Sequence, residues 1–137
     1  MITSYKQYTV AKEKLKKIKE SIVATQKTKV PQVLVRASLG QMKELLADLK
    51  RDMSEYETLH MSHKQDISIS SLEDLMKAPI RYRLAKKMTI EQFAKEVEVH
   101  SRQIARYETE QYHNATTDTL IKILERLKID LKGSIHV

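Results

Sequence analysis

The chain has 137 residues, of which 25 are Lys or Arg and 18 are Asp or Glu, and its formal net charge is +7. It contains no cysteine, which excludes disulfides and thiolate metal sites and is compatible with the reducing cytoplasm, where we expect the protein to act. No apolar run approaches the roughly 18 residues of a membrane span, and no charged start followed by an apolar stretch indicates a signal peptide. Only two Gly and two Pro occur among many helix-forming residues, so the composition predicts an all-α fold.

The basic excess is concentrated at the start of the chain. Residues 1–36 contain nine Lys or Arg and two Glu, whereas residues 37–66 contain four Lys or Arg and six Asp or Glu. Residues 67–137 are nearly balanced, with twelve Lys or Arg and ten Asp or Glu. The N-terminal lysines could therefore contact DNA phosphates or an acidic partner, or they could form a solvated face of a helix that only packs.

Two long amphipathic helices are predicted in the first part of the chain. The first covers residues 3–24, is capped by Thr3 or Ser4, and has apolar residues at spacings of three and four: Tyr8, Ala11, Leu15, Ile18 and Ile22. The second begins near Gln32 or Ser38, ends near Leu59, and repeats the pattern: Val35, Leu39, Met42, Leu46, Leu49, Met53 and Tyr56. Two such stripes joined by a short loop predict an antiparallel helical hairpin.

Residues 60–71 are expected to interrupt the helical pattern. The alternation of Ile67 and Ile69 is compatible with a linker or with a short edge strand. His60 and His63 are three residues apart, but no third ligand lies in register with them. We therefore interpret both histidines as solvated polar residues and predict neither a metal site nor a cofactor.

The next elements begin a second group of helices. Ser70 or Ser71 can cap a short helical turn over residues 72–77, and Pro79 suits the first turn of a following helix over about residues 80–87. Ile80 and Leu84 are expected to face inward. The basic residues of that helix are expected to face outward: Arg81, Arg83, Lys86 and Lys87.

The run from Thr89 to Glu108 has the pattern of two short helices joined by a tight turn. Thr89 and Gln92 can form a capping box at the start of the first helix. Phe93, Ala94 and Val97 share one face of that helix. His100 or Ser101 can cap the second helix, from which Ile104 and Tyr107 would face inward.

The remaining residues of the second short helix point outward and include no carboxylate: Ser101, Arg102, Gln103, Ala105 and Arg106. Arg and Gln side chains form paired hydrogen bonds to guanine and adenine edges in the DNA major groove. The composition is therefore typical of a recognition helix. The alternative is a generic helical bundle whose outward residues are only solvated.

After the loop that follows Glu108, a last helix is expected, capped by Thr116 or Thr117. Its inner stripe consists of Leu120, Ile123, Leu124 and Leu127. The tail IDLKGSIHV is either an irregular chain end or a short strand that pairs with a second chain.

The segments IRYRLAKKM, TIEQFAKEVEV, HSRQIARYE and TTDTLIKILERLKI together resemble the phage-repressor or XRE-type helix-turn-helix family. They correspond in register to its four helices, over about fifty residues from Ile80 to Ile129. Two positions depart from the family pattern. Glu98 stands where the turn usually has Gly, so a left-handed backbone would cost about 1 kcal/mol there, or the turn relaxes. Ile90 stands where the family often has a Gln that contacts DNA.

The resemblance implies a sequence-specific regulator that binds double-stranded DNA, as a dimeric repressor reading a palindrome through the helix over residues 101–109. The residues expected at base edges are Arg102, Gln103 and Arg106. Those expected at phosphates are Thr89, Gln92, Ser101, Arg83 and Asn114.

The order of the parts is similar to that of HigA-type antitoxins, in which an N-terminal helical segment precedes an XRE-type domain. The start ITSYKQY and the run ISISSLEDL support this placement. That layout implies a protein that neutralises a toxin, such as an mRNA ribonuclease, through its N-terminal part and represses its own operon. A further alternative is that the hairpin only dimerises the regulator.

We therefore predict an all-α protein with two domains. Residues 1–66 form the helical hairpin and linker, and residues 67–137 form a compact helix-turn-helix bundle of four to five helices with a short tail. The sequence contains no nucleophile elbow, Walker loop or HExxH motif, so we predict no catalytic residues and no enzymatic activity.

Overall fold

The computed structural model describes residues 1–61 and 66–137, and within these ranges it contains six helices and no strand. The helices in chain order are α1 (Tyr5–Gln26), α2 (Gln32–Met61), α3 (Leu72–Ala85), α4 (Ile90–Val97), α5 (Ser101–Thr109) and α6 (Thr117–Arg126). The predicted all-α fold is confirmed. The described residues form two compact units, Met1–Thr58 and Leu59–Val137.

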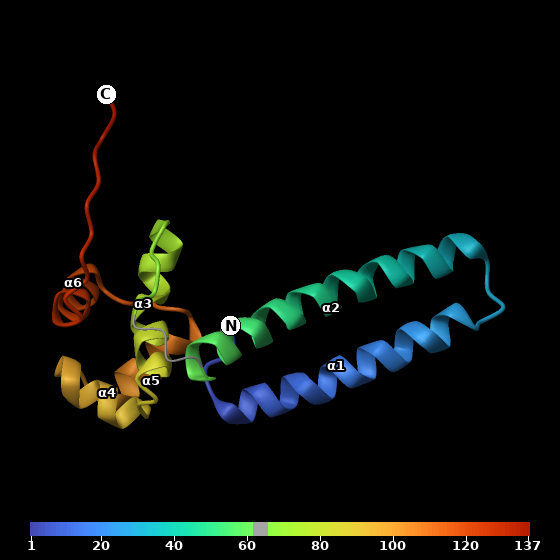
Figure 1. Ribbon diagram of the computed structural model, residues 1–137, viewed down its shortest axis with the longest axis horizontal. Helices are drawn as coiled ribbons and strands as arrows, with labels where there is room; N and C mark the ends of the chain where they lie inside the picture. The colour runs from blue at the N-terminus through green and yellow to red at the C-terminus, as the bar shows by residue number, and fades with distance from the viewer. Residues whose placement is uncertain (62–65) are drawn as a thin grey trace. The chain divides into compact units, whose positions relative to one another are not determined.

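The first unit is the helical hairpin of α1 and α2, which lie side by side and antiparallel (Figure 1). Ser4 caps α1, because its Oγ accepts a hydrogen bond from the backbone N–H of Gln7 at 3.2 Å. Near the chain start, the rings of Tyr8 and Tyr56 stack at a centroid distance of 5.1 Å. The Tyr8 hydroxyl donates a hydrogen bond to the Glu57 carboxylate. These contacts hold the start of α1 against the second half of α2.

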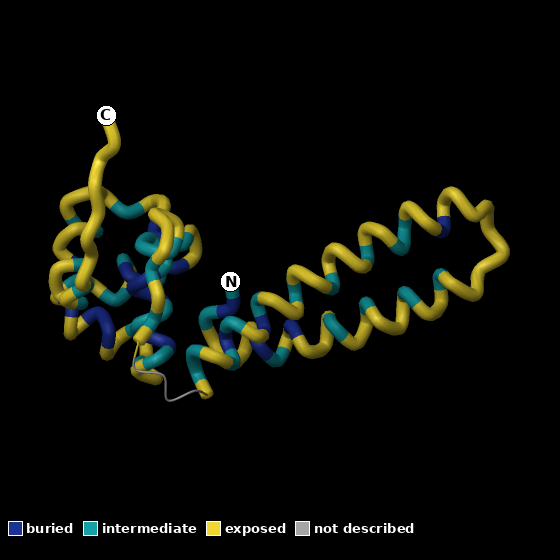
Figure 2. The backbone as a smooth tube through the Cα atoms, turned by 45° about the horizontal axis from the view of Figure 1, so that its top comes forward, coloured by how far each residue is buried: buried dark blue, intermediate teal, exposed yellow. Residues whose placement is uncertain are grey.

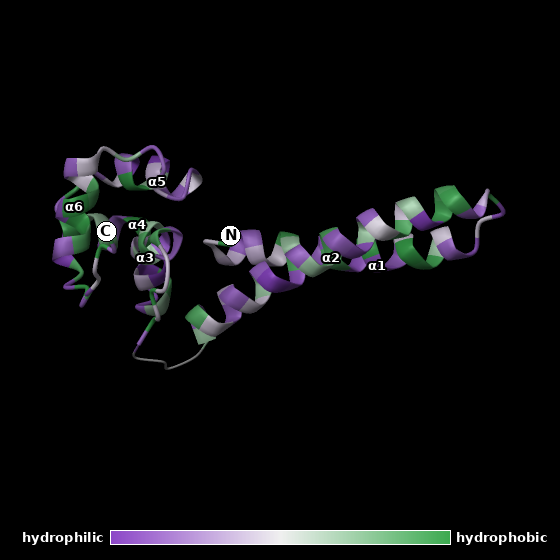
Figure 3. Cartoon of the chain, turned by 90° about the horizontal axis from the view of Figure 1, so that it is seen from above, coloured by the Kyte–Doolittle hydropathy of each residue, from purple (hydrophilic) through white to green (hydrophobic). Residues whose placement is uncertain are grey.

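Burial along the hairpin is uneven (Figure 2). The buried residues of the two helices are Tyr8, Ala11, Val35, Met53 and Tyr56. The other residues of the two predicted stripes are only half-buried, because two helices alone cover each other on one side. Hydrophobic and hydrophilic residues are interspersed along both helices (Figure 3). No helix among the described residues is long and apolar enough to cross a membrane.

The second unit contains α3 to α6 around one apolar core. The side chains with 0% exposure come from each of these helices and from the loop before α6: Ile80, Phe93, Val97, Ile104, Tyr112 and Ile123. Five of these six residues, all except Tyr112, lie at positions that the periodicity predicts to face inward. Residues 66–70 form no regular structure, so the edge-strand alternative for Ile67 and Ile69 is wrong.

The predicted break at Pro79 is wrong, because α3 runs without interruption from Leu72 to Ala85 with Pro79 inside it. Pro79 removes one backbone donor, but it is itself buried in the core. Ser71 caps the helix, since its Oγ accepts from the Asp74 N–H at 3.0 Å. The Asp74 carboxylate then pairs with Arg81 at 2.9 Å, across the turn that contains the proline. Packing and this ion pair thus outweigh the local preference of proline for a helix start.

Candidate nucleic-acid interface

The helix α4 begins with the predicted capping box. The Thr89 Oγ1 accepts from the Gln92 N–H at 3.2 Å, and the Gln92 Oε1 accepts from the Thr89 N–H at 2.9 Å. Phe93, Ala94 and Val97 are buried on one face, as the spacing predicts. This start fixes where the helix-turn-helix begins and places Thr89 and Gln92 at its surface, where both are exposed.

The turn between α4 and α5 passes through Glu98 in a left-handed conformation, with a φ of 56° and a ψ of 43°. Of the two alternatives that the sequence allows, the strained left-handed backbone is the one adopted. Two cationic side chains of α6 hold this residue. Lys122 donates to the Glu98 carbonyl at 3.2 Å, and Arg126 pairs with the Glu98 carboxylate. These contacts offset part of the strain that glycine would avoid.

The helix α5 turns Ile104 and Tyr107 into the core, as predicted. The N-cap position is His100, whose side chain makes no capping hydrogen bond. Its carbonyl accepts from the backbone N–H groups of Gln103 and Ile104 at 2.9 and 3.1 Å. The backbone N–H groups of Ser101 and Arg102, which precede these two, make no hydrogen bond within the described residues and lie at the positive end of the helix dipole.

The outward face of α5 carries two exposed guanidinium groups, those of Arg102 and Arg106. Neither side chain forms a hydrogen bond or an ion pair within the described part of the chain. Ser101 and Gln103 beside them are half-buried. The Gln103 amide donates to the Tyr107 hydroxyl, which directs the amide along the helix surface and leaves its second hydrogen and its oxygen accessible.

Arg83 lies in a different place from the one expected, because its side chain is buried rather than directed into solvent. Its Nε and one terminal nitrogen donate to the two carboxylate oxygens of Glu108 at 2.6 and 2.8 Å. The other terminal nitrogen donates to the Met88 carbonyl at 3.0 Å. The bidentate ion pair connects α3 to the last turn of α5, so Arg83 positions α5 from inside the core.

Arg81 is also engaged within the protein. Its guanidinium donates to Asp74, and this hydrogen bond, together with those from Ser70, holds the pKa of the Asp74 carboxyl well below its usual range. Of the four basic residues that were expected to face outward, only Lys86 and Lys87, which follow α3, are therefore exposed. The Lys86 ammonium lies 5.8 Å from the centre of the Tyr82 ring.

Asn114 lies in the loop between α5 and α6 and is exposed. Its side-chain amide donates to the Arg106 carbonyl at 3.1 Å, which satisfies one of the free carbonyls at the end of α5. Of the predicted site residues, Ser101, Arg102, Gln103, Arg106 and Asn114 are therefore on or beside α5. Thr89 and Gln92 lie at the start of α4.

Two buried residues of this region have no signal in the sequence pattern. Tyr112 has 0% exposure and a left-handed backbone, and its ring lies 5.5 Å from that of Tyr107. Burial raises the pKa of the Tyr112 hydroxyl. Glu108, the partner of Arg83, is the other. Both residues fill the space under the end of α5 and fix its direction.

The ranges that the structure describes contain no assembled metal site. No group of three His, Asp or Glu residues there could hold a metal ion. His60 belongs to the last turn of α2, whereas His63 lies outside the described residues.

Residues 80–133 match the family model described as helix-turn-helix. The match begins inside α3 and ends after α6, so it covers the capping box, the turn and α5. The comparison with curated proteins and the comparison with solved structures each found no match. This part of the chain is an XRE-type helix-turn-helix domain, preceded by the α1–α2 hairpin. Such a domain indicates DNA binding in transcriptional regulation and points to a non-catalytic protein.

Proposed function

We propose that this protein is a sequence-specific regulator of transcription that binds double-stranded DNA and represses as a dimer on a palindromic site. The observation that carries the proposal is the state of the arginines in the second unit. Arg81, Arg83 and Arg126 are each paired with a carboxylate, whereas Arg102 and Arg106 on α5 have no partner and are exposed. A free guanidinium presents a fork of donors that matches the O6 and N7 acceptors of guanine.

Direct reading of bases is assigned to Arg102, Gln103 and Arg106. The Gln103 amide keeps one donor hydrogen and its oxygen available, which is the set that adenine N7 and N6 require. A single short helix contacts only a few base pairs. Two copies related by a two-fold axis would read half-sites about one helical turn apart, which gives the specificity that one copy lacks.

Phosphate contacts are assigned to residues at the rim of the same surface. Ser101 lies at the first position of α5, beside the free N–H groups that favour anions. Thr89 and Gln92 are exposed at the start of α4, and the Gln92 amide nitrogen remains available because its oxygen makes the capping bond. Asn114 is exposed in the loop after α5. Arg83 is withdrawn from this set, since its guanidinium is committed to Glu108.

The experiment that tests the function is selection of bound sequences from a random DNA pool with the full chain. The selected site is then compared with random DNA in a salt titration. A two-fold symmetric site bound about a thousandfold or more tightly than random DNA is the expected result. Equal affinity for all sequences, with only steep salt dependence, would contradict sequence-specific regulation.

Three alanine variants separate the roles on the selected site. Arg102→Ala and Gln103→Ala should each reduce discrimination at one or two base positions, by about 1–3 kcal/mol per half-site. The matched control is Lys43→Ala, which removes an exposed charge from α2. The control should leave the base preference unchanged. If Gln103→Ala weakens binding to all sequences equally, Gln103 does not read a base.

A second candidate function is neutralisation of a toxin protein by the hairpin, with DNA binding as autoregulation. It is favoured by an exposed apolar group at the connection of α1 and α2, where Val30, Val33 and Leu34 are 49%, 78% and 58% exposed. Adjacent apolar side chains that remain accessible often mark a binding surface for another protein.

Coexpression with the product of a neighbouring small reading frame tests this candidate. Copurification that is lost in a Val33→Asp and Leu34→Asp double variant would support it, provided that the variant still binds the selected DNA. Copurification that survives these changes would remove the hairpin tip from the contact. No copurifying product would leave the protein as a regulator only.

A further inference from the structure

The chain after α6 has the sequence pattern of a strand but no partner. Residues 129–137, called the tail here, alternate between apolar and polar side chains. The apolar side chains are those of Ile129, Leu131, Ile135 and Val137, and the polar ones are those of Asp130, Lys132, Ser134 and His136. The tail has no regular structure, and none of its backbone groups makes a hydrogen bond within the described residues. It runs away from α6 as a single extended segment (Figure 1).

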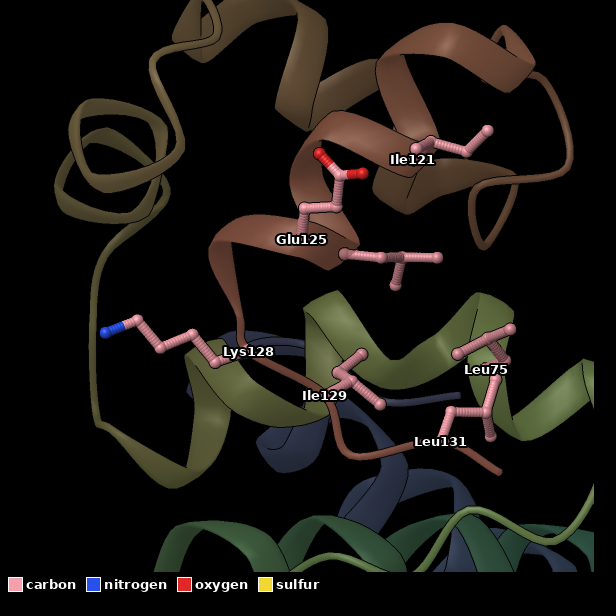
Figure 4. Close-up of a pocket in the computed structure, with 7 residues that line it drawn as sticks. Leu75, Ile121, Glu125, Lys128, Ile129 and Leu131 are labelled. Atoms are coloured by element: carbon pink, nitrogen blue, oxygen red, sulfur yellow. The ribbon is translucent and has the colours of Figure 1, made fainter. Parts of the chain in front are cut away.

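The start of the tail closes one side of an apolar hollow of about 310 Å³. The hollow is lined by Leu75 of α3, by Ile121, Leu124 and Glu125 of α6, and by Lys128, Ile129 and Leu131 (Figure 4). Ile129 and Leu131 thus place the apolar side of the tail toward α3 and α6. The other two apolar residues have no such cover, since Ile135 is 90% exposed and Val137 is fully exposed.

An extended segment of this kind offers a row of free N–H and C=O groups and half of an apolar face. Such a segment is a template for pairing with another strand. The residue pattern also restricts the partner, because it is nearly symmetric about Gly133. In an antiparallel pair centred on Gly133, Ile129 would face Val137 and Leu131 would face Ile135 of the other strand. Asp130 would face His136, and Lys132 would face Ser134, so an acidic group meets one that can carry positive charge.

Other registers lose this match. A shift of one residue places every apolar side chain opposite a polar one. A pair centred on Leu131 would bring Asp130 opposite Lys132, but it would leave Ile135 and Val137 without a facing residue. The sequence is therefore complementary to itself in one register, which is what a two-fold contact between identical chains requires.

We infer that residues 129–137 pair with the same residues of a second copy of this chain, as an antiparallel two-stranded ribbon centred on Gly133. The ribbon provides about eight to ten backbone hydrogen bonds. Ile135 and Val137 of the second copy then lie beside Leu131 and Ile129, and extend the apolar cover over α3 and α6. A two-stranded ribbon alone is marginal in water, and the apolar helix surface beneath it supplies the remaining stabilisation.

This inference rests on the proposed function, which requires two copies on one palindrome, and it assigns the surface that joins them. Its test uses no DNA. A tail that pairs while the protein fails to select a DNA site would therefore contradict the function and leave the pairing intact. A selected palindrome together with an unpaired tail would do the reverse.

The absence of cysteine makes single-cysteine cross-linking of the full chain unambiguous. Gly133→Cys is the probe, because a Cβ at this position meets no atom within 4 Å. In the inferred register the two copies of residue 133 face each other with Cα atoms roughly 4.5–5.5 Å apart, within reach of a disulfide. The matched control is Ser134→Cys, whose two copies would lie roughly 8 Å apart, beyond that reach. In a glutathione redox buffer, the Gly133→Cys dimer should exceed the control at least fivefold.

A second experiment measures the dimer dissociation constant of the full chain by analytical ultracentrifugation. Ile135→Asp should raise it at least tenfold, which corresponds to about 1.4 kcal/mol. The fold of the monomer should not change, since this side chain is almost fully exposed. Ser134→Asp, on the polar side of the ribbon, is the control and should leave the constant unchanged or lower it, because it faces Lys132.

A charge exchange fixes the register. Asp130→Lys should weaken the dimer by placing a cation opposite His136, and the double variant Asp130→Lys with His136→Asp should restore it. Equal cross-linking at residues 133 and 134, or a dimer unaffected by Ile135→Asp, would overturn the inference and place the contact elsewhere, for example on the hairpin. A monomer at all concentrations would overturn it as well.

Discussion

The buried ion pair between Arg83 and Glu108 predicts a large loss of stability when either partner is removed. The two side chains are only 7% and 5% exposed, and they are joined by two short hydrogen bonds. Removing one member leaves the other charge buried without its counter-charge, which costs about 3–5 kcal/mol. We expect Arg83→Met and Glu108→Leu each to lower the free energy of unfolding by about 3 kcal/mol or more.

Thermal unfolding followed by far-UV circular dichroism measures this effect. For a unit of this size, 1 kcal/mol shifts the melting temperature by about 4–8 °C, so each single variant should melt at least about 12 °C lower. Arg126→Met is the matched control, because its ion pair with Glu98 has side chains that are 46% and 60% exposed. An exposed pair contributes about 0–1 kcal/mol, so the control should stay within about 8 °C of the natural sequence.

The double variant with both Arg83→Met and Glu108→Leu gives the decisive comparison. It should be more stable than either single variant, because no unpaired charge is left in the core and two apolar side chains take the place of the pair. It still loses the hydrogen bond to the Met88 carbonyl, a loss of about 1 kcal/mol. Single variants as stable as the Arg126→Met control, or a double variant that loses the sum of both, would refute this reasoning.

Three further predictions concern the stability at acid pH, the turn at Glu98 and the salt dependence of DNA binding. Arg81 lowers the pKa of Asp74, so the stability that this carboxylate contributes is present above about pH 4 and is lost as the pH falls through its lowered pKa. Between about pH 5 and pH 3, the free energy of unfolding measured in urea should therefore fall less for Asp74→Asn than for the natural protein. Replacing Glu98 by alanine keeps the strained left-handed backbone and removes the ion pair, whereas replacing it by glycine also removes the ion pair but relieves the strain. Glu98→Gly should therefore unfold at a higher urea concentration than Glu98→Ala. The opposite order would show that the turn is not strained. The slope of log affinity for DNA against log salt concentration should be no steeper than about −9 for a dimer, because each copy has five unpaired cations between residues 80 and 108. Replacing Lys14, Lys16 and Lys17 by glutamine should leave this slope unchanged. A shallower slope in that variant would show that α1 contacts DNA.

The periodicity of the sequence predicts the helices and the core well, because both follow from the spacing of apolar residues along single helices. The capping box of Thr89 and Gln92 and the inward residues Phe93, Val97 and Ile104 are all local patterns, and the structure confirms them. From the sequence, the backbone conformation at Glu98 could only be narrowed to two alternatives, a left-handed residue or a relaxed turn. Its outcome depends on Lys122 and Arg126, which are 24 and 28 residues away in the chain.

The prediction that Arg83 faces solvent is wrong for a reason that can be read from its position in the helix. Arg83 lies three residues after Ile80 and one before Leu84, so its position on the helix belongs to the inward face. The expectation that a charged side chain faces water outweighed this spacing. A buried arginine requires a buried carboxylate, and Glu108 supplies it from 25 residues away, a pairing that no local rule predicts.

The comparison of arginines explains why net charge is a weak guide to the interface of this protein. Residues 67–137 carry only two more Lys and Arg than Asp and Glu, which by itself does not indicate a DNA-binding surface. The acidic residues are not distributed evenly, however, because Asp74, Glu98 and Glu108 are each bound to one arginine away from the outward face of α5. The Arg83–Glu108 and Arg126–Glu98 pairs connect different elements of this unit, and the Arg81–Asp74 pair lies within α3. In this unit, the guanidinium groups that remain available are the ones on α5. The positive charge that can meet DNA is therefore determined by which cations the fold leaves unpaired, not by their total number.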